Sequence, residues 1–157
     1  VRQSQWRDSI EVVCSDITKY NIDEVKFDII VCNPPFFRDS LRSPNAVRSQ
    51  ARHNDSLSYE KLADTVLRLL ANDGTFNLVL PFDMADTFTL IAARRGLYMS
   101  KRTKVVTRQG VAPKRVLLSF VKQQIVYVEE DELVMFDSNN AETLDYISLV
   151  KDFYLKY

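Results

Sequence analysis

The stretch Phe27-Asp28-Ile29-Ile30-Val31-Cys32-Asn33-Pro34-Pro35-Phe36 decides the fold. Its first six residues form an apolar run typical of buried parallel strands, which are rich in isoleucine and valine. The two prolines end the strand, because each fixes φ near about −65°, lacks an N–H and holds the preceding residue extended. Asn33 and Pro34 are therefore expected to present their oxygens outward, beside an aromatic ring. Such acceptors suit a planar group that bears an NH2, such as adenine; the alternative is an ordinary strand-ending turn.

The rest of the chain alternates strand-like and helix-like segments. A first helix is predicted at 59–71, capped by Ser58 and stopped by Asn72-Asp73-Gly74, and a second at 84–95, closed by Gly96. A Gly- and Pro-containing turn separates two strand-like runs that read as an antiparallel hairpin. The predicted strands are 10–14, 27–32, 75–80, 97–107, 114–123 and, shorter, 133–136; residues 37–57 read as a loop and 143–155 as a terminal amphipathic helix. This order predicts an α/β fold, a doubly wound sheet with one antiparallel strand.

Size and composition indicate one domain. The chain has 157 residues, 46% of them apolar. Its 21 basic residues balance its 21 acidic residues, so the net charge gives no indication of a nucleic-acid partner. Cys14 and Cys32 both fall in apolar runs and are expected to be reduced core residues of a cytoplasmic protein. No apolar run approaches the roughly 20 residues of a membrane span.

The glycines are few and far apart. Only Gly74, Gly96 and Gly110 occur, so the chain offers no G-x-G loop to let a backbone approach a dinucleotide-like cofactor. The chain also begins at Val1 without a methionine. We therefore expect a cofactor loop, if the protein has one, to lie upstream of Val1.

The Asn33-Pro34-Pro35-Phe36 motif after a hydrophobic strand resembles the substrate-amine motif of S-adenosylmethionine-dependent methyltransferases that modify adenine N6, guanine N2 or glutamine N5. A longer match resembles the bacterial tRNA1(Val) adenine-N6 methyltransferases, which act on the adenosine 3′ of the anticodon. The match includes the following segments: Asn33-Pro34-Pro35-Phe36-Phe37-Arg38, Leu41-Arg42-Ser43-Pro44-Asn45, Ala51-Arg52-His53, Asp55-Ser56-Leu57-Ser58-Tyr59 and Tyr146-Ile147-Ser148-Leu149-Val150-Lys151-Asp152-Phe153-Tyr154-Leu155.

The resemblance implies a Rossmann-like class I methyltransferase sheet of order 3-2-1-4-5-7-6. Residues 10–14 would be its third strand, and residues 1–157 would be the C-terminal part of a single methyltransferase domain that lacks the first two strands. The third strand would then have lost its neighbour, leaving an open edge able to pair with a second copy. We expect this chain alone to be inactive and to bind S-adenosylmethionine weakly or not at all.

The resemblance also assigns site residues. The catalytic group would be Asn33, Pro34, Pro35 and Phe36: the Asn33 side-chain oxygen and the Pro34 carbonyl would accept the two amine hydrogens, and Phe36 would stack on the base. Asp16 and Ile17 would bind the cofactor adenine, with Asn33 as a further cofactor contact. For Asp16, an ordinary turn or helix-capping role is the alternative.

Two groups of basic residues are candidates for RNA contacts. The first lies in the loop after the motif, and the second lies in the hairpin. The loop group is Arg38, Arg42, Arg48, Arg52 and His53; the hairpin group is Lys101, Arg102 and Lys104, followed by Arg108, Lys114 and Arg115. Residues 129–145 hold seven acids and no base, so the alternative for the hairpin is pairing with the chain's own tail.

The predicted function is S-adenosylmethionine-dependent methylation of adenosine N6 in tRNA1(Val), with tRNA as the partner. The chemistry needs no metal, and His53 is the only histidine. A Ser-His-Asp hydrolase would depend on that residue and lacks a nucleophile-elbow sequence. Other amine methyltransferases remain alternatives: guanine-N2 on ribosomal RNA, adenine-N6 on DNA, or glutamine-N5 on a protein. A non-catalytic chain that docks RNA is an alternative of another class.

Overall fold

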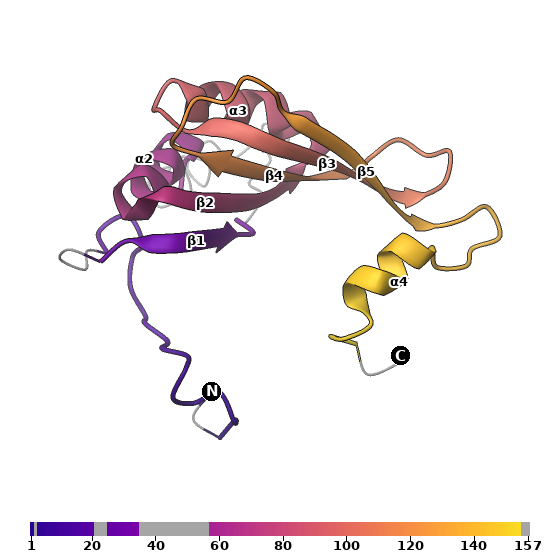
Figure 1. Cartoon of the computed structure of the whole chain (residues 1–157), viewed down its shortest axis with the longest axis horizontal. Helices are drawn as coiled ribbons and strands as arrows, with labels where there is room; N and C mark the ends of the chain where they lie inside the picture. The colour runs from indigo at the N-terminus through magenta and orange to yellow at the C-terminus, as the bar shows by residue number, and fades with distance from the viewer. Residues whose placement is uncertain (2, 21–24, 35–56, 155–157) are drawn as a thin grey trace, which may run out of the picture.

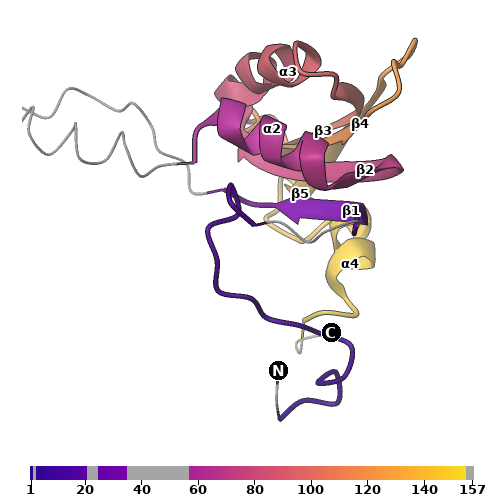
Figure 2. The same cartoon turned by 90° about the vertical axis from the view of Figure 1, so that its left-hand side faces the viewer.

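The computed structural model describes residues 1, 3–20, 25–34 and 57–154. Its centre is a five-stranded sheet of order β1-β2-β4-β3-β5. The strands are β1 (Phe27–Cys32), β2 (Leu70–Pro81), β3 (Tyr98–Arg108), β4 (Arg115–Val121) and β5 (Glu129–Phe136), and the helices are α2 (Tyr59–Leu69), α3 (Ala85–Ala93) and α4 (Leu144–Val150), with a 3-10 turn at Phe82–Met84. Helices α2 and α3 cover one face, and α4 lies on the other side beyond the sheet (Figures 1 and 2).

The strand directions confirm the predicted mixed sheet. β1 and β2 are parallel, and β4 runs antiparallel to both β2 and β3. The order β1-β2-β4-β3 therefore matches the 4-5-7-6 half of the class I methyltransferase sheet. β5 adds a further strand, parallel to β3. β1 ends the sheet and has no neighbour on its outer edge among the described strands.

The core lies between the sheet and helices α2 and α3. Alternate residues of β2 and β4 point into it, and Phe76, Phe88 and Phe120 form its aromatic centre, with Phe88 and Phe120 ring centroids 5.3 Å apart. On the opposite face, Ile29 and Val31 of β1 remain 67% and 74% exposed. Parallel strands are normally covered on both faces, so this face of β1 lacks the cover that such strands usually have.

Helix α2 begins as predicted and ends earlier. The Ser58 hydroxyl accepts a hydrogen bond from the Lys61 N–H at 3.2 Å, which caps the first turn. The helix ends at Leu69, and β2 starts at the very next residue. The predicted helix stop at Asn72-Asp73-Gly74 is therefore wrong, because these residues lie inside β2.

A bulge explains why that segment looked like a turn. Between the first two pairs of the β1–β2 ladder, β1 advances from Phe27 to Ile29 while β2 advances from Leu70 to Thr75. Gly74 lies so close to β1 that an added Cβ would stand 2.9 Å from the backbone oxygens of Phe27 and Asp28. Glycine is needed here because the two backbones approach closely.

The predicted strand at 10–14 is absent. These residues form no strand and are exposed, with Val12 at 75%. No described strand pairs with these residues, so their backbone has no ladder to join. Cys14 is consequently exposed, which corrects its predicted place in the core, whereas Cys32 is partly buried.

The remaining helices and strands differ from the predicted ones only in the residues at which they begin and end. The second helix spans Ala85–Ala93 after its 3-10 turn, and Gly96 follows with φ +89°. The short strand predicted at 133–136 starts earlier, at Glu129. The terminal helix ends at Val150, with the Thr143 hydroxyl as its cap.

Candidate active site

Asn33 and Pro34 lie where β1 ends. Cys32, the last residue of β1, forms the last pair of the β1–β2 ladder with Leu78. Asn33 therefore directly follows that ladder. In open α/β sheets ligands bind outside the carboxyl ends of the strands, and this is such an edge. Asn33 is exposed and Pro34 is buried. Within the described ranges, the Asn33 amide has no hydrogen-bond partner. Pro35 and Phe36 lie outside the described residues.

The neighbouring strand end contributes further groups to this edge. Pro81 closes β2, and Phe82 and Asp83 follow in the 3-10 turn. The Arg102 guanidinium stacks over the Phe82 ring, 5.3 Å from its centroid, and its Nη1 lies 3.0 Å from Asp86 Oδ1. Burial, together with the negative charge of Asp83, raises the pKa of the Tyr59 hydroxyl above its ordinary value. Tyr59 is therefore neutral at physiological pH.

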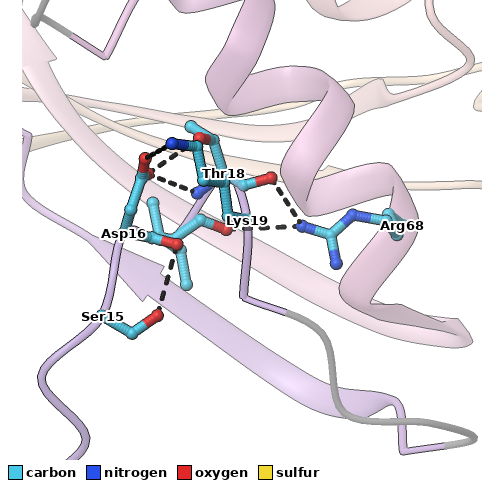
Figure 3. Close-up of polar contacts among 6 residues, drawn as sticks. Ser15, Asp16, Thr18, Lys19 and Arg68 are labelled. Atoms are coloured by element: carbon cyan, nitrogen blue, oxygen red, sulfur yellow. Dashed lines mark hydrogen bonds and ion pairs between the residues drawn. The ribbon is translucent and has the colours of Figure 1, made fainter.

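Asp16 organises a single helical turn. Its Oδ1 accepts hydrogen bonds from the Thr18 hydroxyl (2.8 Å) and the Thr18 N–H (3.0 Å) (Figure 3). Its backbone oxygen accepts from the N–H groups of Lys19 and Tyr20. These hydrogen bonds from Thr18 lower the pKa of Asp16 below 3.8. The carboxyl group is therefore an ionised acceptor, and it is exposed.

Arg68 holds the far end of this turn. The last carbonyls of a helical turn have no partner within it and are often bonded by basic side chains. Here Arg68 Nη1 donates to the Tyr20 oxygen at 2.5 Å, and Nη2 lies 3.3 Å from the Ile17 oxygen. Nη2 lies 3.3 Å from the Thr18 oxygen as well (Figure 3). One guanidinium on α2 thus binds three backbone oxygens of the Asp16 turn.

A cavity of about 300 Å³ lies beside the Asp16 turn. Odd-numbered residues of one segment line it, as expected of an extended chain, whose alternate side chains share a face. Its lining residues are Glu11, Val13, Ser15, Ile17, Tyr20 and Phe27.

The Asp16 turn fits the adenine part of a nucleoside cofactor chemically. A carboxylate has about four acceptor positions, so Asp16 retains acceptor capacity beyond the two bonds from Thr18, and Ile17 offers an apolar surface that is 43% exposed. The described contacts do not bring Asp16 together with Asn33. The cavity reaches Phe27, the first residue of β1, whereas Asn33 follows the last.

The hairpin residues predicted to bind RNA lie near acidic side chains of the same protein. Lys101 forms an ion pair with Glu129 of β5, and Arg102 pairs with Asp86. Lys104 stands in register with Glu132. The acidic tail therefore pairs with β3, as the alternative interpretation anticipated. The loop candidates Arg38, Arg42, Arg48, Arg52 and His53 all lie outside the described residues.

The sequence interpretation missed two features of this region. The first is the hydrogen bond from Arg68 to Tyr20, which lies 48 positions away in the sequence. The only sequence signal for this bond was a basic residue in the last turn of a predicted helix. The cations at the hairpin turn were noticed as part of a basic run but were not separated from those farther along β3. In the described ranges, no cluster of three or more potential metal ligands occurs, and no helix there is long and apolar enough to cross a membrane.

Sequence comparison finds close curated relatives. The chain is 44% identical to a tRNA1(Val) (adenine(37)-N6)-methyltransferase of Bacteroides fragilis, over 99% of this chain and 66% of that protein. Enzymes of the same name from Phocaeicola vulgatus and Haemophilus influenzae are 42% and 37% identical, over 99% and 100% of this chain and 65% and 66% of theirs. The chain thus spans just under two thirds of these relatives. No family model matches it.

Structure comparison supports the fold. A predicted O-methyltransferase from Agrobacterium tumefaciens superposes with a TM-score of 0.67 at 17% identity, over 96% of this chain and 68% of that one. At this identity the likeness concerns the fold alone. It agrees with a Rossmann-like class I methyltransferase sheet.

Proposed function

We propose, from the premise that this chain belongs to the family of bacterial tRNA1(Val) (adenine-N6)-methyltransferases, that it is part of an enzyme that methylates N6 of adenosine 37 in tRNA1(Val). The observation that carries the proposal is the exposed Asn33 amide at the carboxyl edge of β1, without a hydrogen-bond partner among the described residues. A tRNA substrate also places the protein in the cytoplasm.

Asn33 and Pro34 would make the amine nucleophilic. The N6 lone pair of adenine is delocalised into the ring, so the amine is a poor nucleophile. If the Asn33 side-chain oxygen and the Pro34 carbonyl accept its two hydrogens, the nitrogen moves toward tetrahedral geometry and its developing positive charge is stabilised. S-adenosylmethionine, when bound, supplies an electrophilic methyl group.

Four further residues would position the two reactants. The target base must leave its stack to reach Asn33, and Phe36 is assigned the role of stacking on it, with Pro35 fixing the turn between them. Asp16 would accept a hydrogen bond from the adenine amino group of the cofactor while Ile17 packs on its ring. The names of the relatives favour adenine over the alternatives of guanine, DNA and glutamine.

The test is Asn33→Ala in the full-length protein, compared with Asn139→Ala in the turn after β5. Methyl transfer to unmodified tRNA1(Val) is measured by mass spectrometry of nucleosides, and cofactor binding by calorimetry. We expect Asn33→Ala to lose about 100- to 1000-fold in rate while cofactor affinity changes little. Parallel loss of cofactor binding and activity, or an equal loss in Asn139→Ala, would contradict the proposed role.

A further inference from the structure

We propose that the turn of the β3–β4 hairpin, residues 108–115, contacts the phosphate backbone of the RNA substrate. The proposal rests on the function proposed above and names the surface that holds the RNA while its base is at Asn33. It moves the RNA contact away from Lys101, Arg102 and Lys104 to the exposed cations Arg108 and Lys114.

Strand register places this turn at the same edge as Asn33. Pro81, the last residue of β2, pairs with Arg115, the first residue of β4, and Arg115 in turn pairs with Val105 of β3. The Phe82 N–H donates to the Lys114 oxygen at 3.2 Å, which ties the hairpin turn to the end of β2. Figure 1 shows the β3–β4 connection beyond the side toward which β1 and β2 point.

The distance suits a nucleic-acid contact. β4 is the second strand from β1 and β3 is the third, and neighbouring strands are about 4.8 Å apart, so the two ends of the hairpin turn lie about 10 and 14 Å to the side of β1. A nucleotide whose base reaches Asn33 has its flanking phosphates within this range. Lysine and arginine side chains bind phosphates without reading sequence, and such contacts fix the register of the RNA.

Charge pairing distinguishes the hairpin turn from Lys101 and Arg102 of β3. Lys101 and Arg102 each have an acidic partner. Arg108 instead donates to the neutral Asn140 amide (2.6 Å) and enters no ion pair with the residues that the structure describes. Lys114 enters no ion pair within the described part of the chain.

The acids near this edge include Asp137 and Asp83, and Glu142 bridges to Phe136, the β5 partner of Arg108. Asp137 accepts hydrogen bonds from the N–H groups of Asn139 (2.8 Å) and Ala141 (2.9 Å), so its carboxylate is engaged in its own turn. Asp83 follows β2 and acts on Tyr59. The proposal therefore rests on Arg108 and Lys114, two exposed cations of the turn.

The experiment compares Lys114→Ala with Lys101→Ala in the full-length protein. Binding of unmodified tRNA1(Val) transcript is measured at several salt concentrations. We expect Lys114→Ala to weaken binding and to reduce the slope of log affinity against log salt by about 0.7 to 1, because one phosphate contact is lost. Lys101→Ala should leave the slope unchanged, and Lys114→Arg should restore it.

Two results would contradict the proposed RNA surface. Equal slope changes in Lys114→Ala and Lys101→Ala, or an unchanged slope in Lys114→Ala, would overturn the proposed surface. Methyl transfer by the unaltered protein is assayed in parallel. If it transfers no methyl group yet shows the Lys114-dependent salt slope, the proposed function fails while the RNA surface stands.

Discussion

Arg68 on α2 donates to the backbone oxygen of Tyr20 at 2.5 Å, although the two residues are 48 positions apart. Through this bond and those to Ile17 and Thr18, a helix of the core holds the turn that carries Asp16. The turn pairs with no strand in the described residues, so its position depends on side-chain contacts of this kind.

Replacing Arg68 should loosen the turn. Arg68→Met removes charge-assisted hydrogen bonds, typically worth about 1.5 to 3 kcal/mol each when they are well formed. We expect faster amide hydrogen exchange at residues 16–20 of this chain and, in the full-length protein, about tenfold weaker cofactor binding. Arg95→Met, which removes a partner of Asp64 on the same helix, is the matched control. Unchanged exchange in Arg68→Met would refute the role.

The ionisation of Asp16 should depend on Thr18. Hydrogen bonds from Thr18 stabilise the charged carboxylate, so the pKa of Asp16 lies below its ordinary value of 3.8. Their contribution is present above pH 3.8 and is lost as the pH falls through the lower folded-state pKa. Carboxyl NMR titration should show this low pKa, and Thr18→Val, which removes the hydroxyl donor, should raise it. An identical titration curve in both proteins would count against the described bonds.

Gly74 should tolerate no side chain. A methyl group there would stand 2.9 Å from two backbone oxygens of β1, which cannot move without opening the ladder. We expect Gly74→Ala to lower the free energy of unfolding by about 1 to 3 kcal/mol in urea titrations. Gly110→Asn is the control, because Gly110 has φ +80° with open space around it and asparagine accepts such a φ. Equal costs at both sites would contradict the close approach of β2 to β1.

The two cysteines should differ in reactivity. Cys14 is exposed, whereas burial raises the pKa of the Cys32 thiol above its ordinary value and so reduces the reactive thiolate. At mildly alkaline pH, iodoacetamide should label Cys14 first, as peptide mass spectrometry can show. In urea the difference should disappear. Faster labelling of Cys32 in the folded chain would show that the end of β1 is open to solvent.

Local patterns predicted those parts of the fold that local residues determine. The apolar run of β1, the Ser58 cap and the hairpin were each signalled within a few residues. Gly74 was misread because Asn-Asp-Gly ordinarily stops a helix, and the contact that requires this glycine comes from β1, far away in sequence.

Predictions failed where a segment depends on a distant partner. Residues 10–14 are a mainly apolar, valine-containing run typical of a strand, but they pair with no strand in the described chain. The first half of β5 is acidic, which disfavours a strand, yet Glu129 and Glu132 stand in register with Lys101 and Lys104 of β3. In the candidate site, the exposure of Asn33 followed from its prolines, whereas the hold of Arg68 on the Asp16 turn could not be read from either segment alone.

The direct passage from Leu69 in α2 to Leu70 in β2 leaves the backbone no slack. One inserted residue would rotate the preceding helix by about 100° or reverse the inward and outward sides of the following strand. Either change would draw Val66 or Phe76 out of the core. This junction therefore sets the spacing and rotation between the helix that anchors the Asp16 turn and the strand that supports Asn33. Insertions or deletions at the junction should not be tolerated.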